Sequence, residues 1–193
     1  SKDYRAAIIQ LKNALQLDHR NLSARVLLGK SYLRLGNGAG AERQLVFAKS
    51  TGADESLTLI PLGRALLLQG KNKEVLDEIR LANRPQNIKT EVLFLRGQAY
   101  LASRRKRQAE HSFKEALRIN KDHASSVIGM ARLLNELGKY KEATKDYKEA
   151  IITYQKIIRK FNDYPLFDIY LSIVRCHELN DKKSSALLIL REM

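Results

Sequence analysis

Two short segments of this 193-residue chain have residue types that could bind a nucleotide. Gly29-Lys30-Ser31 has the ending of a phosphate-binding loop, but that loop needs a strand before it and a glycine five positions earlier, where Ala24 stands. The run 36–40, Gly-Asn-Gly-Ala-Gly, lacks the spacing of a dinucleotide-binding loop and follows a helical pattern. We therefore interpret the first segment as helix and the second as a flexible turn between helices.

The histidines and the single cysteine predict neither catalysis nor metal binding. His19 and His123 fall in predicted turns, and no pair of the four histidines has the spacing of metal ligands. Cys176 and His177 are adjacent on a predicted helix, so their side chains point about 100° apart and cannot act as nucleophile and base. We expect a non-enzymatic protein without cofactor or metal, in which Cys176 is inert and His177 packs in the core.

Composition narrows the classes of protein that remain. Apolar residues make up 44% and charged residues 29%, which is typical of a folded chain, and no apolar stretch is long enough to cross a membrane. One cysteine excludes an intrachain disulfide. The 35 basic and 21 acidic residues give a net charge of +14, which favours an acidic partner.

Side chains of the same size return every 34 residues. Small residues repeat in three ladders and large apolar residues in a fourth: Ala7, Ala41, Val75, Ala109 and Ala143; Gly29, Gly63, Gly97 and Ala131; Ala14, Ala48, Ala82, Ala116 and Ala150; Leu11, Leu45, Ile79, Phe113 and Tyr147. Two short helices and two turns take about 34 residues, and stacked pairs cover faces that no pair can bury alone. We predict an all-α solenoid of stacked antiparallel helix pairs.

The predicted helices number about eleven. An opening helix at 3–17 precedes the pairs, whose helices are 22–35 and 39–50, 56–69 and 73–82, 88–102 and 106–119, and 124–137 and 140–161. The second helix of the fourth pair is lengthened by nine residues and stops at 162–165, and two more helices follow at 166–179 and 183–193. Gly36, Gly70 and Gly138 are predicted C-caps, whereas Pro61 requires that its helix begin close to it.

The domain prediction is one solenoid over 1–193, divided into repeats at 3–21, 22–55, 56–89, 90–123, 124–166 and 167–193. Helices of the second type stand at both ends without a polar capping helix, which solenoids need. We interpret the chain as a fragment of a longer array whose uncapped ends favour self-association.

The ladders resemble the tetratricopeptide repeat family. Four units carry its pattern: Leu28-Gly29, Tyr32, Gly36, Ala41, Leu45 and Ala48; Leu62-Gly63, Leu66, Gly70, Val75 and Ala82; Gly97, Tyr100, Ala109, Phe113 and Ala116; Ala131, Leu134, Gly138, Tyr140, Ala143, Tyr147 and Ala150. The chain departs where the family has a large aromatic residue, with Arg25 in the first unit, and the closing proline is missing. The resemblance implies a scaffold that binds partner proteins on its inner, concave face.

A narrower resemblance covers residues 3–80. The runs 3–15, 24–30 and 64–71 are similar to the repeat-bearing lipoproteins of PEP-CTERM protein-sorting systems. That family is bacterial, exported and associated with exopolysaccharide production, which implies a periplasmic or membrane-anchored protein. The residues alone do not give the compartment.

By the resemblance, two rows of side chains face the concave groove. The apolar row is Val26, Ile60, Phe94, Ile128 and Leu171, and the second row is Lys30, Arg64, Gln98, Arg132 and Arg175. Members of the two rows are four residues apart in each helix, hence on one face. An apolar strip beside a cationic strip is suited to a peptide with acidic groups next to apolar anchors. A solvated face without a ligand is the alternative.

A second basic feature is the run Arg104, Arg105, Lys106 and Arg107, in a predicted turn. It opens the stretch 104–160, which has fifteen basic and seven acidic residues. This stretch could bind an anionic polymer, either an acidic polysaccharide or a nucleic acid, through contacts that weaken with salt. No aromatic residues alternate with the run, so stacking on bases is not expected. The alternative is a solvated turn.

Overall fold

The computed structural model describes residues 2–139, 142 and 145. The helices of this part are α1 (Lys2–Leu17), α2 (Leu22–Arg34), α3 (Gly38–Ser50), α4 (Glu55–Leu68), α5 (Asn72–Glu78), α6 (Gln86–Ala102), α7 (Lys106–Ile119) and α8 (Ala124–Glu136). No strand occurs among the described residues, so the all-α prediction is confirmed. The predicted helices 140–161, 166–179 and 183–193 lie outside them.

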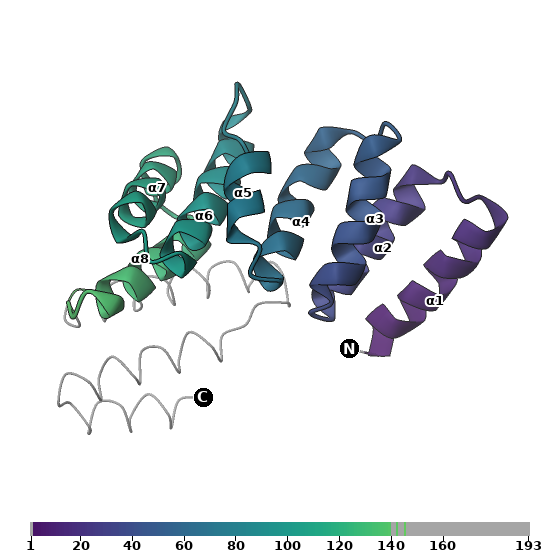
Figure 1. Ribbon diagram of the computed structural model, residues 1–193, viewed down its shortest axis with the longest axis horizontal. Helices are drawn as coiled ribbons and strands as arrows, with labels where there is room; N and C mark the ends of the chain where they lie inside the picture. Colours follow the sequence, from purple (N-terminus) through teal and green to yellow (C-terminus); the bar gives the residue numbers. More distant parts are fainter. Residues whose placement is uncertain (1, 140–141, 143–144, 146–193) are drawn as a thin grey trace. The chain divides into compact units, whose positions relative to one another are not determined.

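The chain divides into two compact units, Ser1–Ser103 and Arg104–Met193. In the first unit, each of the helices α1 to α5 contacts the next along the chain, and α2 also contacts α4, as α4 contacts α6. Figure 1 shows the hairpins of this unit following one another in chain order. The first helix of each pair therefore packs on the first helix of the next, which is the arrangement of a solenoid.

Several ladder residues lie in the core of the first unit. Ala41, Leu45, Val75 and Ile79 are fully buried. At Gly29 an added Cβ would lie 2.7 Å from Cγ of Leu45, and at Gly63 it would lie 2.7 Å from Cδ1 of Leu95. The glycines thus leave the room that large side chains of neighbouring helices occupy, as the ladders predict.

Helix α5 is shorter than predicted. The predicted helix 73–82 ends at Glu78. Ala82 lies in the following loop with φ of 37° and is exposed, so this ladder residue is not part of the core. Pro85 disfavours helical backbone at Arg84, so it prevents the helix from continuing past Asn83 but does not by itself explain the end at Glu78. The free carbonyls at the end of α5 are satisfied by Arg96 of α6, whose Nη1 donates to the oxygens of Leu76 (2.7 Å) and Ile79 (3.2 Å).

Helix α4 begins at Glu55, one residue before the predicted start, so Pro61 is its seventh residue; Asp54 caps the helix by accepting a hydrogen bond from the amide of Ser56. One local prediction, the flexible turn over 36–40, is wrong. Gly38 to Gly40 begin α3 instead of forming a flexible turn, and Asn37 caps it at 2.7 Å from the amide of Gly40. Gly38 is buried there, and a Cβ would lie 2.9 Å from the carbonyl oxygen of Ala65.

Arg25 occupies the position where the family pattern has an aromatic residue. Its guanidinium stacks 3.7 Å from the ring centre of Phe47 and donates hydrogen bonds to the carbonyl of His19 and to the side chain of Gln44. A planar cation on an aromatic face fills the space that an aromatic pair would fill. The departure from the pattern is therefore accommodated by packing within the first hairpin.

Ion pairs connect consecutive repeats of the first unit. Lys71, after α4, donates to the carboxylate of Glu42 in α3 at 2.7 Å, and Arg84 donates to both carboxylate oxygens of Glu55. Burial alone would raise the pKa of Glu42, but the hydrogen bonds from Lys71 and Gln69 outweigh it, so that pKa lies below its ordinary value. Hydrogen bonding to Arg84 lowers the pKa of Glu55 in the same way.

In the second unit, α7 and α8 pack against each other. Phe113 of α7 is fully buried, and an added Cβ at Gly129 of α8 would lie 2.5 Å from its ring. Lys106, at the start of α7, donates to the carbonyl of Glu136 at 2.9 Å, close to the end of α8. A large side chain of one helix thus packs against a glycine of the next, as it does in the first unit.

Candidate functional site

The segments that suggested nucleotide or metal chemistry have structural roles. Lys30 and Ser31 lie within α2, and Ser31 donates a hydrogen bond to the carbonyl of Leu27 at 2.9 Å. His123 precedes α8 with its Nδ1 2.7 Å from Oγ of Ser126. Within the described part of the chain, no cluster of histidine, cysteine or acidic residues could hold a metal ion. Cys176 and His177 are outside that part.

The candidate site is the exposed side of α2, α4 and α6, called here the A-helix face. It is defined by the following side chains of the first unit: Leu27, Lys30, Arg34, Leu57, Ile60, Pro61, Arg64, Leu68, Glu91, Phe94 and Gln98. In α4 the members recur at three- and four-residue intervals, which places them on one side of the helix. The contacts of α4 with α2 and with α6 bring the three helices together.

The predicted apolar row is less accessible than the sequence suggested. Val26 is buried with 4% of its surface exposed, and Ile128 in the second unit is also buried. Ile60 and Phe94 are half-buried and pack against the core. That these residues face a ligand stays a prediction. Leu171 lies outside the described residues.

Three leucines that the sequence analysis did not select are more exposed. Leu27 has 52%, Leu57 48% and Leu68 55% of its surface open to solvent. Leu27 and Leu68 lie three and four residues from Lys30 and Arg64. Leu57 and Leu68 lie 34 residues after Ser23 and Arg34, so the repeat marks them as equivalent positions of the next unit. Leu27 was missed because the family pattern selects its neighbour Val26.

The second predicted row is only partly a cationic strip. Arg64 of α4 donates from Nη2 to the Glu91 carboxylate of α6 at 3.1 Å. Lys30 is exposed, and no ion pair joins it to another described residue. Gln98 is half-buried and Arg132, in the second unit, is exposed; Arg175 lies outside the described part. In the first unit the face is thus mainly apolar, with positive charge concentrated on α2.

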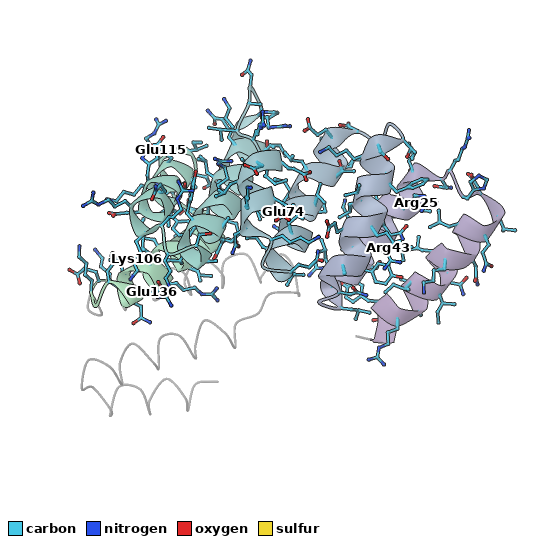
Figure 2. All side chains as sticks on the ribbon, in the orientation of Figure 1. Arg25, Arg43, Glu74, Lys106, Glu115 and Glu136 are labelled. Carbon is cyan, nitrogen blue, oxygen red and sulfur yellow. The ribbon has the colours of Figure 1, made fainter. Side chains whose placement is uncertain are left out.

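The basic run Arg104 to Arg107 lies at the start of the second unit. Arg104, Arg105 and Arg107 are exposed, whereas Lys106 is half-buried and bonded to Glu136. Figure 2 shows Lys106 and Glu136 next to each other. The run is therefore partly structural and partly open to solvent.

No helix among the described residues combines the length and apolar character needed to cross a bilayer. Stacked helical hairpins with a 34-residue stride define the class of α-solenoid repeat proteins. Residues 94–165 match the tetratricopeptide repeat family model. No curated protein sequence matches the chain.

Solved structures of this class have the same fold. The chain is similar to PilW, a type IV pilus biogenesis factor, with a TM-score of 0.71 at 17% identity over 99% of this chain and 84% of that one. For PilF of Pseudomonas aeruginosa the TM-score is 0.65 at 19% identity, over 97% and 82%. For a tetratricopeptide repeat protein of Parabacteroides merdae it is 0.64 at 18% identity, over 99% and 72%. These likenesses show the fold of the chain.

Proposed function

We propose that the protein binds a segment of a partner protein on the A-helix face of its first unit. The observation that supports this is the exposure of about half the surface of Leu27, Leu57 and Leu68 on helices that pack together. Exposed leucines that share one side of packed helices offer apolar area to a partner. A helical or extended segment could bury them in the manner of other groove-binding peptides.

The charges on this face define the polar part of the preferred partner segment. Lys30 and Arg34 are exposed on α2 beside Leu27, whereas Arg64 is neutralised by Glu91 on α4 and α6. We therefore expect apolar anchors against α4 and an acidic group against α2. The preference for an acidic partner then comes from the basic residues of α2 and not from a cationic strip that runs over all three helices.

Selection of peptides from a displayed library on the immobilised protein, followed by anisotropy titration, tests this proposal. Burying a leucine that is half exposed contributes on the order of 1 kcal/mol, so Leu57→Glu with Leu68→Glu should weaken binding at least about tenfold. Lys30→Glu should weaken binding of acidic peptides only.

The matched control is Leu17→Glu, because Leu17 is 90% exposed on α1, outside the A-helix face. It should leave affinity unchanged. Equal affinities for the wild type and the Leu57 and Leu68 double variant, with unchanged helicity, would remove the A-helix face from the mechanism.

The biological pathway is a further part of the proposal. The resemblance of residues 3–80 to PEP-CTERM-associated lipoproteins suggests a role in exported protein sorting or exopolysaccharide production. A lipoprotein signal encoded upstream of this sequence would support that role, and a cytoplasmic full-length product would contradict it. Self-association through the terminal helices also stays a prediction, which light scattering can test.

A further inference from the structure

The turn before α7 differs from three equivalent turns of the chain. Positions 36, 70, 104 and 138 are 34 residues apart, and each follows the first helix of a pair. Glycine stands at three of them with φ of 70°, 70° and 75°, and Arg104 stands at the fourth with φ of 58°. Glycine adopts this left-handed conformation without a steric penalty, whereas a side chain with Cβ does not. The protein therefore keeps an arginine where its own pattern favours glycine.

No side-chain contact among the described residues explains this choice. Arg104 is exposed, and no hydrogen bond or ion pair of its guanidinium reaches another described residue; the same is true of the Arg107 guanidinium. Lys106 between them has a structural role through Glu136. A strained residue persists where something compensates for the strain, and no side chain among the described residues bonds to the Arg104 guanidinium, which points to a bound ligand.

Two carboxylates of this unit already have basic partners. Lys106 lies 3.9 Å from the Glu136 carboxylate, and Lys114 donates to Glu110 at 2.6 Å. The hydrogen bond with Lys114 lowers the pKa of Glu110, with a smaller contribution from the charge of Lys139. Among the described residues, the charges of Arg104 and Arg107 thus stay open to an anion.

An apolar side chain accompanies the arginines. Leu137, the C-cap of α8, is 42% exposed and directly follows Glu136, whose carbonyl receives the hydrogen bond from Lys106. No residue of 103–107 or 136–139 is aromatic, so these residues themselves offer no stacking platform to bases or sugar rings. One exposed leucine beside arginines favours a polypeptide with acidic residues and a single apolar anchor, because arginine pairs with carboxylates through two parallel hydrogen bonds.

We propose that Arg104, Arg107 and Leu137 of the second unit form a docking surface for an acidic segment of a partner protein, separate from the A-helix face of the first unit. The arginines hold the carboxylates, and the leucine contacts one apolar side chain between them. This surface recruits its partner through the edge of a repeat, and its function does not depend on the site proposed above.

Arg104→Gly gives the sharpest test, because it should change stability and binding in opposite directions. The probe is a labelled synthetic peptide in which aspartate and glutamate flank one leucine, titrated at low and physiological salt. We expect the variant to melt about 2–4 °C higher as the strain is relieved. We expect it to bind the peptide about five- to tenfold more weakly, and Arg104→Gly with Arg107→Gln more weakly still.

Two controls separate the site from general charge effects. Gly70→Arg places an arginine in the equivalent turn of the first unit, where no atom lies within 4 Å of the added Cβ, and should lower the melting temperature by a similar amount. Arg43→Gln removes an exposed arginine of α3 and should leave peptide affinity unchanged.

Unchanged peptide affinity in Arg104→Gly would overturn the proposal, since the arginine would then have no recognition role. Tighter binding of single-stranded RNA, an acidic polysaccharide or phosphatidylglycerol vesicles than of the peptide would also overturn it. Salt-sensitive peptide binding that is lost in Arg104→Gly and kept in Arg43→Gln would support it.

Discussion

The packing of Leu45 against Gly29 makes the most direct prediction about the solenoid. Gly29→Ala adds a Cβ that would lie 2.7 Å from Cγ and 3.0 Å from Cδ2 of Leu45. The optimal distance between carbon atoms is about 3.5–4.0 Å, so the two helices or the leucine must move by about 1 Å. Leu45 is fully buried, and Cγ is its branch point, so both methyl groups must move with it.

Two effects of opposite sign determine the free energy of unfolding of this variant. Alanine in a helix interior is favoured over glycine by about 1 kcal/mol. Overpacking a filled core costs about 1–3 kcal/mol. With the contact as short as it is, we expect Gly29→Ala to lower the stability by about 1–2 kcal/mol.

Removing the leucine should reverse the sign. Leu45→Ala by itself costs about 2–5 kcal/mol because it leaves a cavity. In that background the methyl group of Gly29→Ala no longer clashes, so the substitution should stabilise the protein by up to about 1 kcal/mol. The coupling between the two positions is then about 2–3 kcal/mol, within the range of contacting residues.

Urea unfolding followed by far-UV circular dichroism measures all four members of this cycle. Leu59→Ala is the control background, because Leu59 is equally buried but is not among the atoms nearest to the added Cβ. There Gly29→Ala should remain destabilising. A Gly29→Ala variant that is more stable than the wild type, or that has the same effect with and without Leu45, would refute the packing argument.

Two further predictions concern the polar contacts of the first unit. Arg96→Met leaves the carbonyls of Leu76 and Ile79 without their donor and should lower the stability by about 1–3 kcal/mol, with faster amide exchange in α5; an Arg43→Met control should change neither. The pKa of Glu42 is lowered from 4.5 in the folded protein, so its carboxylate stabilises the fold above that pH and loses this effect as the pH falls through the folded value. Glu42→Gln should therefore lower the urea midpoint at neutral pH and match the wild type in acid, and a difference that does not change with pH would contradict this reasoning.

Most of the helical order could be predicted from the repeat. The predicted helices 3–17 and 106–119 agree with α1 and α7 to within one residue, because regular spacing of small and large residues fixes both the helix and its partner face. The end of α5 could not be predicted, since Ala82 continues the ladder in the sequence although the helix ends at Glu78 and Ala82 has a left-handed backbone. The start of α4 at Glu55, one residue before the predicted start, depends on the Asp54 cap, which sequence patterns place only to within a few residues.

The candidate site was predictable only in part. Lys30 and Arg64 are exposed, and three- and four-residue spacing determines which residues of a helix share a side; that their rows bind a ligand stays a prediction. The burial of Val26 and the pairing of Arg64 with Glu91 depend on how neighbouring helices approach, which a pattern within one helix does not contain.

The sequence alone determined that this protein is a stack of helical hairpins, because a fixed stride of small and large residues leaves each hairpin with faces that only its neighbours can cover. Only the tertiary structure decided which side chains remain open to a partner. Exposure depends on the distances between helices, and it selected Leu27, Leu57 and Leu68 where the pattern had selected Val26. It also gave the backbone angle of Arg104, which identifies one turn among four equivalent ones as different.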